Sequence, residues 1–140
     1  MTSCVVDASV VSKLYFQEDF SEECVALFSS RPHLLAPGLL WAEVANVAWK
    51  RRTRGQLSRE QADFILTEAM HLPIEIAPIE ELIHSALRLA VRTGRTVYDC
   101  LYLALALDRA CPFITADRRL VNALAGGPLK SHVAWIGRRR

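Results

Sequence analysis

Apolar and polar residues alternate along the chain in a way that predicts short strands separated by amphipathic helices. Five segments are short and apolar, or alternate with the period of two that is typical of strands. We expect strands at residues 3–7, 33–37, 73–78, 112–115 and 132–136. Between them, apolar residues recur every three to four positions, which indicates helices. One short helix follows the first strand, and the others are expected at residues 21–30, 37–54, 58–70, 79–93, 97–110 and 117–124.

Residues at the predicted helix ends support these limits. Ser58 and Gln61 have the spacing of a capping box, in which each side chain accepts a hydrogen bond from the other residue's backbone. Gly94 stands where a left-handed residue often ends a helix, and Thr96 is placed to cap the next one. Strands that alternate with helices predict an α/β fold of three layers, with a central parallel sheet of about five short strands.

The composition is that of a globular protein and changes this picture little. With 140 residues and a hydrophobic content of 51%, we expect residues 1–140 to form one domain. No apolar run reaches the roughly 20 residues that cross a bilayer, and the first residues do not have the pattern of a signal peptide. We therefore expect a cytoplasmic protein that has no membrane partner. The net charge of +2 is too small to identify a nucleic-acid-binding protein.

Two aspartates lie just beyond predicted strands. Asp7 follows the apolar residues 4–6, and Asp117 comes two residues after the segment 112–115. Ligands of parallel α/β sheets bind beyond the carboxyl ends of the strands, so both acids lie where a site is expected. Each acid could instead cap the helix that follows, by accepting hydrogen bonds from free backbone N–H groups. The sequence leaves both interpretations open for either residue.

Two further acids lie in apolar surroundings. Glu43 has leucine or valine at its helical neighbour positions i−4, i−3, i+1 and i+4. Asp99 lies in the segment VYDCLYLALAL, which is apolar on every side, so we expect its carboxylate to be buried. A lone buried carboxylate costs several kcal/mol or takes up a proton. An acid three residues after a capping Thr96 is also typical of a helix start, but that interpretation leaves the apolar surroundings unexplained.

All four acids lie where a strand leads into a helix or in the first turns of a helix, so the fold can bring them to one pocket. Carboxylates that share a pocket raise one another's pKa unless a cation neutralises them. The four histidines and four cysteines lack the spacing of zinc ligands, and oxygen ligands alone favour Mg²⁺ or Mn²⁺. Such ions activate water and stabilise phosphoryl oxygens, which suggests hydrolysis of phosphodiester bonds.

The motifs VVDASV, AEVANV, VYDCLYLALAL and FITADRRL, in this order, resemble the PIN-domain ribonucleases, and in particular the VapC toxins of bacterial toxin–antitoxin pairs. The resemblance covers nearly the whole chain. It implies a PIN-like fold and a metal-dependent endoribonuclease that uses Mg²⁺, for which Mn²⁺ can substitute. It also implies an RNA substrate, an antitoxin partner and a homodimer. The implied catalytic and metal-binding residues are Asp7, Glu43, Asp99 and Asp117, with Ser9 and Thr115 as polar supports.

Basic residues near these acids are candidates for contacts with RNA phosphates. Three arginines flank the acids, namely Arg95, Arg118 and Arg119. Lys13 is also near, but the simpler interpretation is an exposed helix lysine. The basic run from Lys50 to Arg54 is explained by the preference for cations at a helix C-terminus.

Two alternative functions remain open at this point. A phosphatase of the haloacid dehalogenase type also begins with an aspartate after an apolar strand, but it typically has a second aspartate where this chain has Ser9. A catalytically silent binding module would use its acids as helix caps and its basic run to dock a partner. That second alternative does not explain Asp99.

Overall fold

Five parallel strands form the centre of the computed structural model, which describes residues 2–138. Their order across the sheet is β3-β2-β1-β4-β5, so the first strand lies in the middle. The register pairs Val5 with Leu35 on one side and with Phe113 on the other. The strands are β1 (Ser3–Val6), β2 (His33–Pro37), β3 (Ile74–Ala77), β4 (Phe113–Thr115) and β5 (Val133–Trp135). The predicted parallel sheet is confirmed, with each strand within one residue of its expected ends.

Within residues 2–138, seven α-helices connect and cover the strands. Their bounds are α1 (Ala8–Ser12), α2 (Ser21–Ser29), α3 (Leu39–Thr53), α4 (Arg59–Ala69), α5 (Ile83–Thr93), α6 (Val97–Asp108) and α7 (Arg118–Leu124). The capping box of Ser58 and Gln61 is present, and the Thr96 hydroxyl accepts a hydrogen bond from the backbone N–H of Asp99. Gly94 ends α5 with a φ of 75°. The local sequence signals therefore predicted these helix ends correctly.

The expectation of one continuous helix over residues 79–93 is wrong. The segment begins with a 3-10 turn, η1 (Ile79–Glu81), and α5 starts only at Ile83. Between them Leu82, whose side chain is buried, ends η1 and caps the start of α5 with a φ of −114°. Two further 3-10 turns, η2 (Lys130–His132) and η3 (Ile136–Arg138), flank β5.

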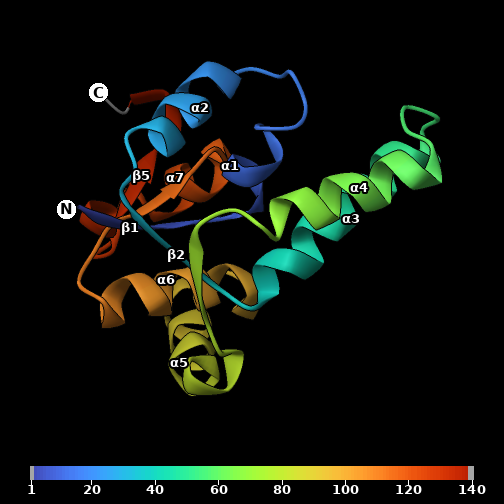
Figure 1. Cartoon of the computed structure of the whole chain (residues 1–140). Coiled ribbons are helices and arrows are strands. Elements are labelled where there is room, and N and C mark those ends of the chain that lie inside the picture. The colour runs from blue at the N-terminus through green and yellow to red at the C-terminus, as the bar shows by residue number, and fades with distance from the viewer. Residues whose placement is uncertain (1, 139–140) are drawn as a thin grey trace.

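Helices lie on both faces of the sheet, as Figure 1 shows. One face is covered by α6, which packs on β1, β2 and β4, with α5 packed against α6. The other face carries α1, α2 and α7, and α3 and α4 form a hairpin that projects from the body. The central strands are buried completely, with Val5, Val6 and Ile114 at 0% exposure. No helix within residues 2–138 is long and apolar enough to span a membrane.

Candidate active site

Asp7 is the most constrained acid at the carboxyl edge of the sheet. Its Oδ1 accepts hydrogen bonds from the Ser9 hydroxyl at 2.5 Å and from the backbone N–H groups of Ser9 and Val10 at 3.1 and 3.3 Å. Its Oδ2 accepts a hydrogen bond from the Thr115 hydroxyl at 2.6 Å. The side chain is only 8% exposed. Both carboxylate oxygens are therefore fixed, one by the turn into α1 and the other by β4.

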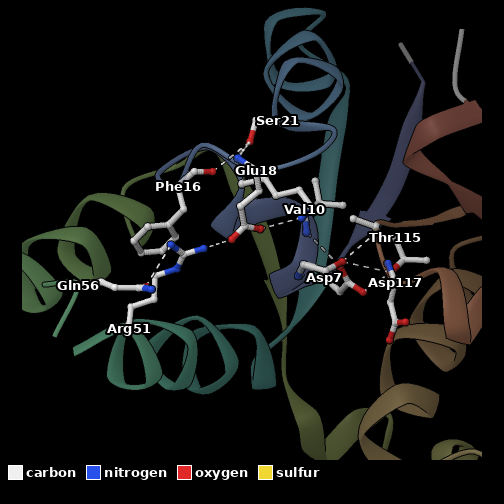
Figure 2. A network of polar contacts seen from close by, with 12 residues as sticks. Asp7, Val10, Phe16, Glu18, Ser21, Arg51, Gln56, Thr115 and Asp117 are labelled. Carbon is white, nitrogen blue, oxygen red and sulfur yellow. Dashed lines mark hydrogen bonds and ion pairs between the residues drawn. The ribbon is translucent and has the colours of Figure 1, made fainter. Parts of the chain in front are cut away.

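Ser9 and Thr115 tie the ends of β1 and β4 together. The Ser9 hydroxyl also accepts a hydrogen bond from the backbone N–H of Ala116 at 2.9 Å, and the Thr115 hydroxyl accepts one from that of Asp117 at 3.0 Å. Figure 2 shows Asp7, Thr115 and Asp117 side by side. Because β1 and β4 are neighbours, residues more than a hundred positions apart in the chain form one polar network.

Asp7 and Asp117 are both N-caps, so the capping interpretation of the sequence is confirmed. Asp7 caps α1, and the Asp117 Oδ1 accepts hydrogen bonds from the backbone N–H groups of Arg119 and Leu120 at 3.0 and 3.3 Å. A cap alone, however, does not require the hydrogen bond that Asp7 accepts from Thr115 of β4. The two interpretations are compatible, and capping fixes the direction in which each carboxylate points.

Burial raises the pKa of Asp7 to about 6, well above its ordinary value of 3.8. The hydrogen bonds from Ser9, Thr115 and Val10 act in the opposite direction, and the nearby negative charge of Asp117 raises the pKa further. Such a displaced pKa at a strand end is typical of functional sites.

Glu43 projects from α3 and contacts a residue that the sequence did not single out. Tyr102 of α6 donates a hydrogen bond from its hydroxyl to Oε1 of Glu43 at 2.5 Å. Partial burial raises the pKa of Glu43, the Tyr102 hydrogen bond lowers it, and the charges of Asp7 and Asp99 raise it further. Burial and the Glu43 carboxylate in turn raise the pKa of the Tyr102 hydroxyl. The negative charges of Asp7 and Asp99 therefore both act on Glu43.

Helical spacing places Tyr102 near Asp99 but does not connect it with Glu43. This tyrosine lies three residues after Asp99 in α6 and so shares a face with that acid. Its aromatic ring stacks on Phe113 of β4 at a centroid distance of 5.4 Å, which positions its hydroxyl.

Asp99 is less buried than its apolar segment predicts, and the expectation of a buried carboxylate is wrong. Residues 100–106 of α6 are buried, but Asp99 lies in the first turn of the helix and its side chain remains 29% exposed. Arg95, just before the helix, forms an ion pair with it, with Nη2 of Arg95 3.2 Å from Oδ2 of Asp99. The helix start explains both its exposure and its access to this partner.

The three arginines proposed for RNA phosphates have different surroundings. Arg95 is engaged by Asp99. The guanidinium of Arg118 lies over the ring of Trp135 at 4.1 Å from its centroid, and Arg119 is exposed in the first turn of α7. Their contact with RNA stays a prediction.

Comparison with known proteins identifies the fold family. The family model described as "PIN domain" matches residues 4–125. This chain belongs to the PIN-domain family. It is 36% identical over 120 residues to Ribonuclease VapC3 of Pyrobaculum aerophilum. The aligned region covers 84% of this chain and 92% of that protein.

Solved structures agree with this PIN-domain assignment at the level of the fold. PAE2754 from Pyrobaculum aerophilum superposes with a TM-score of 0.69 and 22% identity, over 97% of this chain and 85% of that one. A toxin–antitoxin complex from Klebsiella pneumoniae gives a TM-score of 0.62 and 18% identity, over 94% and 95%. The resemblance noted in the sequence is thus confirmed, and the family assignment decides against the haloacid dehalogenase alternative.

The acids of this PIN domain suit a hard divalent cation by their chemistry but do not form a closed cage. Within residues 2–138, no group of three or more histidine, cysteine, aspartate or glutamate side chains is arranged to hold a metal ion. The donor set nevertheless consists only of carboxylate oxygens that raise one another's pKa, which is the ligand type that Mg²⁺ and Mn²⁺ prefer. Asp99 would have to exchange Arg95 for the cation, whereas Glu43 could keep the Tyr102 hydrogen bond on Oε1 and offer its other oxygen.

Proposed function

We propose that this PIN-domain protein is an endoribonuclease that hydrolyses RNA phosphodiester bonds in the presence of Mg²⁺, or of Mn²⁺ in its place. The proposal rests on one observation above all. Thr115 joins Asp7 to the backbone N–H of Asp117 at the carboxyl ends of β1 and β4, in a chain of the PIN-domain family. Burial raises the pKa of Glu43 from α3, and the charges of Asp7 and Asp99 raise it further. A divalent cation relieves repulsion of this kind. The name of the 36% identical relative, Ribonuclease VapC3, agrees with RNA as the substrate.

The four carboxylates have the role of ligands in this proposal. Asp7, Glu43, Asp99 and Asp117 would hold the cation, which when bound lowers the pKa of water and stabilises charge on phosphoryl oxygens. Ser9 and Thr115 keep both oxygens of Asp7 in fixed positions through their hydroxyl groups. Tyr102 holds Glu43 in place through its own hydroxyl, and its hydrogen bond favours the ionised carboxylate.

Cleavage of structured RNAs by the purified protein tests this function. We expect no cleavage in EDTA and cleavage on addition of Mg²⁺ or Mn²⁺, with products that carry a 5′-phosphate and a 3′-hydroxyl. Attack by water leaves these ends, whereas attack by the ribose 2′-hydroxyl leaves a 2′,3′-cyclic phosphate. A cyclic phosphate product, or equal cleavage in EDTA, would show that the proposed chemistry is wrong.

We further propose that the protein is the toxin of a toxin–antitoxin pair, acts in the cytoplasm as one domain of residues 1–140, and forms a homodimer. The fold shared with the toxin–antitoxin complex from Klebsiella pneumoniae supports this assignment. An antitoxin arginine that enters the acid pocket would pair well with carboxylates. Expression of the chain alone should arrest growth of a bacterial host, and the Asp7→Asn variant, expressed to the same level, should not. Normal growth with abundant folded wild-type protein would contradict the toxin assignment.

A further inference from the structure

A groove of about 280 Å³ lies beside the acids, between α1 and the C-terminal half of α3. One of its lining residues is Ser9, whose hydroxyl donates a hydrogen bond to Asp7. The groove therefore shares a wall with the candidate active site. We call it the basic groove, because four cationic side chains and a single carboxylate line it: Lys13, Lys50, Arg51, Arg54 and Glu18.

Two of the four cations are fixed by the carboxylate of Glu18. Lys13 places Nζ 2.8 Å from Oε1 of Glu18, and Arg51 binds the other oxygen of the same carboxylate. Arg51 also lies over the ring of Phe16, 4.1 Å from its centroid, and Figure 2 shows Phe16, Glu18 and Arg51 together beside Asp7. The Lys13 side chain is only 15% exposed, so the interpretation of an exposed helix lysine is wrong. These contacts hold two positive charges rigidly at the base of the groove.

The other two cations are exposed and have no counterion. Lys50 and Arg54 form no ion pair within residues 2–138, and they lie one helical turn apart at the end of α3. The helix C-terminus favours cations there, as the sequence indicates. This preference does not explain why Lys50 and Arg54 line the same groove as Ser9. Like charges this close repel one another, and an anion in the groove would relieve that repulsion.

We propose that the basic groove binds phosphates of the RNA strand next to the bond that is cleaved, with Lys50 and Arg54 as its phosphate contacts. This inference rests on the proposed function. An RNA strand brings one negative charge per nucleotide, and the carboxylates of the site repel it. The cations of the groove would offset this repulsion, because Ser9 lines the groove and also contacts Asp7 of the candidate site. Lys13 and Arg51, held by Glu18, add a fixed positive field that does not depend on long, mobile side chains.

Binding of a fluorescent single-stranded RNA to the full chain in EDTA tests the groove, because cleavage is then prevented. The test variant is Lys50→Ala with Arg54→Ala, and a second variant reverses both charges to glutamate. The matched control is Arg88→Ala with Arg92→Ala, which removes two exposed positive charges from α5. All four substituted side chains are exposed, and the melting temperature of each variant will verify that it is folded.

We expect the alanine pair in the groove to bind RNA about tenfold more weakly at low salt, and the glutamate pair more weakly still, whereas the α5 control binds like the wild type. Each lost phosphate contact on a single strand makes the dependence of log K on log salt shallower by about 0.7, so loss of two contacts predicts a change of about 1.4. Binding and salt dependence equal to those of the wild type would overturn the proposal.

Two further results separate the possible failures. If the wild type cleaves RNA while the groove variants bind it normally, the groove assignment is wrong and the proposed function stands. If the wild type neither binds nor cleaves RNA, the proposed function fails and this inference fails with it. Oligoglutamate serves as a probe for acidic peptides. If the groove variants bind RNA as the wild type does but no longer bind oligoglutamate, the groove is a protein-binding surface and the proposal is wrong.

Discussion

The two halves of the proposed acid site are built differently, although each would contribute two carboxylates. Asp7 and Asp117, the strand-end pair, are held by backbone N–H groups at the ends of β1 and β4, and Asp7 also accepts bonds from two hydroxyls. Glu43 and Asp99, the helix pair, project from α3 and α6 and each contact one side chain. The first pair is fixed by the fold itself, whereas the second is held by contacts that can be exchanged.

This difference indicates a division of roles within one site. Backbone N–H groups cannot leave the strand-end pair without unfolding a helix start, so these carboxylates are in place before a cation arrives. The partners of the helix pair, Tyr102 and Arg95, are side chains that can rotate away. We therefore expect the helix pair to complete the site only when a cation arrives, which Asp99 binds in exchange for Arg95 and Glu43 binds through the oxygen that Tyr102 does not contact. The predictions below follow from this contrast.

The largest effect on RNA cleavage should come from the loss of one charged carboxylate, in either the strand-end pair or the helix pair. Asp99→Asn keeps the shape of the side chain but removes its charge, and we expect cleavage of RNA in Mg²⁺ to fall by about 10²–10³-fold. Asp108→Asn changes an exposed acid in the same helix and should leave cleavage unchanged. If Asp99→Asn cleaves like the control, the helix pair does not belong to the site.

The second prediction concerns the pH dependence of stability in the metal-free protein, which probes the strand-end pair. The pKa of Asp7 is about 6 in the folded chain and near 3.8 in the unfolded chain, so the folded state binds the proton more tightly. Its contribution to stability is therefore complete below about pH 4 and is lost as the pH rises through 6. We expect this single group to reduce the free energy of unfolding by roughly 2–3 kcal/mol over that interval.

Chemical denaturation at several pH values measures this change. Asn caps helices as well as Asp does, so Asp7→Asn keeps the cap while it abolishes the titration. The variant should lack the decline between pH 4 and 6 that the wild type shows. If the free energy of unfolding changes with pH in the same way for the wild type and for Asp7→Asn, the assignment of a raised pKa to Asp7 is contradicted.

A smaller effect is expected from the partner of Glu43. Tyr102→Phe removes the hydroxyl that donates to the carboxylate but keeps the ring that stacks on Phe113. Because this hydrogen bond lowers the pKa of Glu43, its loss should raise that pKa and reduce cleavage by about tenfold, with the activity profile shifted to higher pH. Tyr98→Phe, on an exposed tyrosine of the same helix, is the control. A uniform loss at every pH would indicate a purely structural role for Tyr102.

The strand-end pair was predictable from the sequence, because its positions follow from local patterns. Asp7 and Asp117 come after apolar strands, and parallel strands that are neighbours place their carboxyl ends at one edge. The five strands and most helix limits were predictable for the same reason, since caps and periodicity are local. The break at Leu82 was missed because no glycine or proline marks it in the sequence.

The surroundings of the helix pair could not be predicted, because they arise from tertiary packing. Tyr102 is 59 residues from Glu43, and no local pattern connects them. Asp99 lies in an apolar segment, yet its position in the first turn leaves it partly exposed and paired with Arg95. Hydropathy alone therefore predicted a burial that the helix start prevents. The pairing of Lys13 with Glu18 was missed for the same reason, since an intervening loop brings them together.

The smallest effect should come from Arg95, which competes with a cation for Asp99. Both side chains are about one-third exposed, so Arg95→Gln should change the free energy of unfolding by only about 0.5 kcal/mol or less. Without this competitor, the protein should bind Mn²⁺ a few times more tightly. Arg92→Gln, at an exposed position of α5, should change neither quantity. Weaker Mn²⁺ binding by Arg95→Gln would show that the arginine holds Asp99 in place for the cation.

Titration calorimetry with Mn²⁺ tests most directly whether the two pairs form one cation site. The wild type, Asp7→Asn from the strand-end pair and Asp99→Asn from the helix pair are compared, with Asp108→Asn as the control. We predict that the wild type and the control bind Mn²⁺ equally, and that both site variants bind it at least about tenfold more weakly. Wild-type affinity in either site variant, or no binding by the wild type, would contradict a single site shared by the four acids.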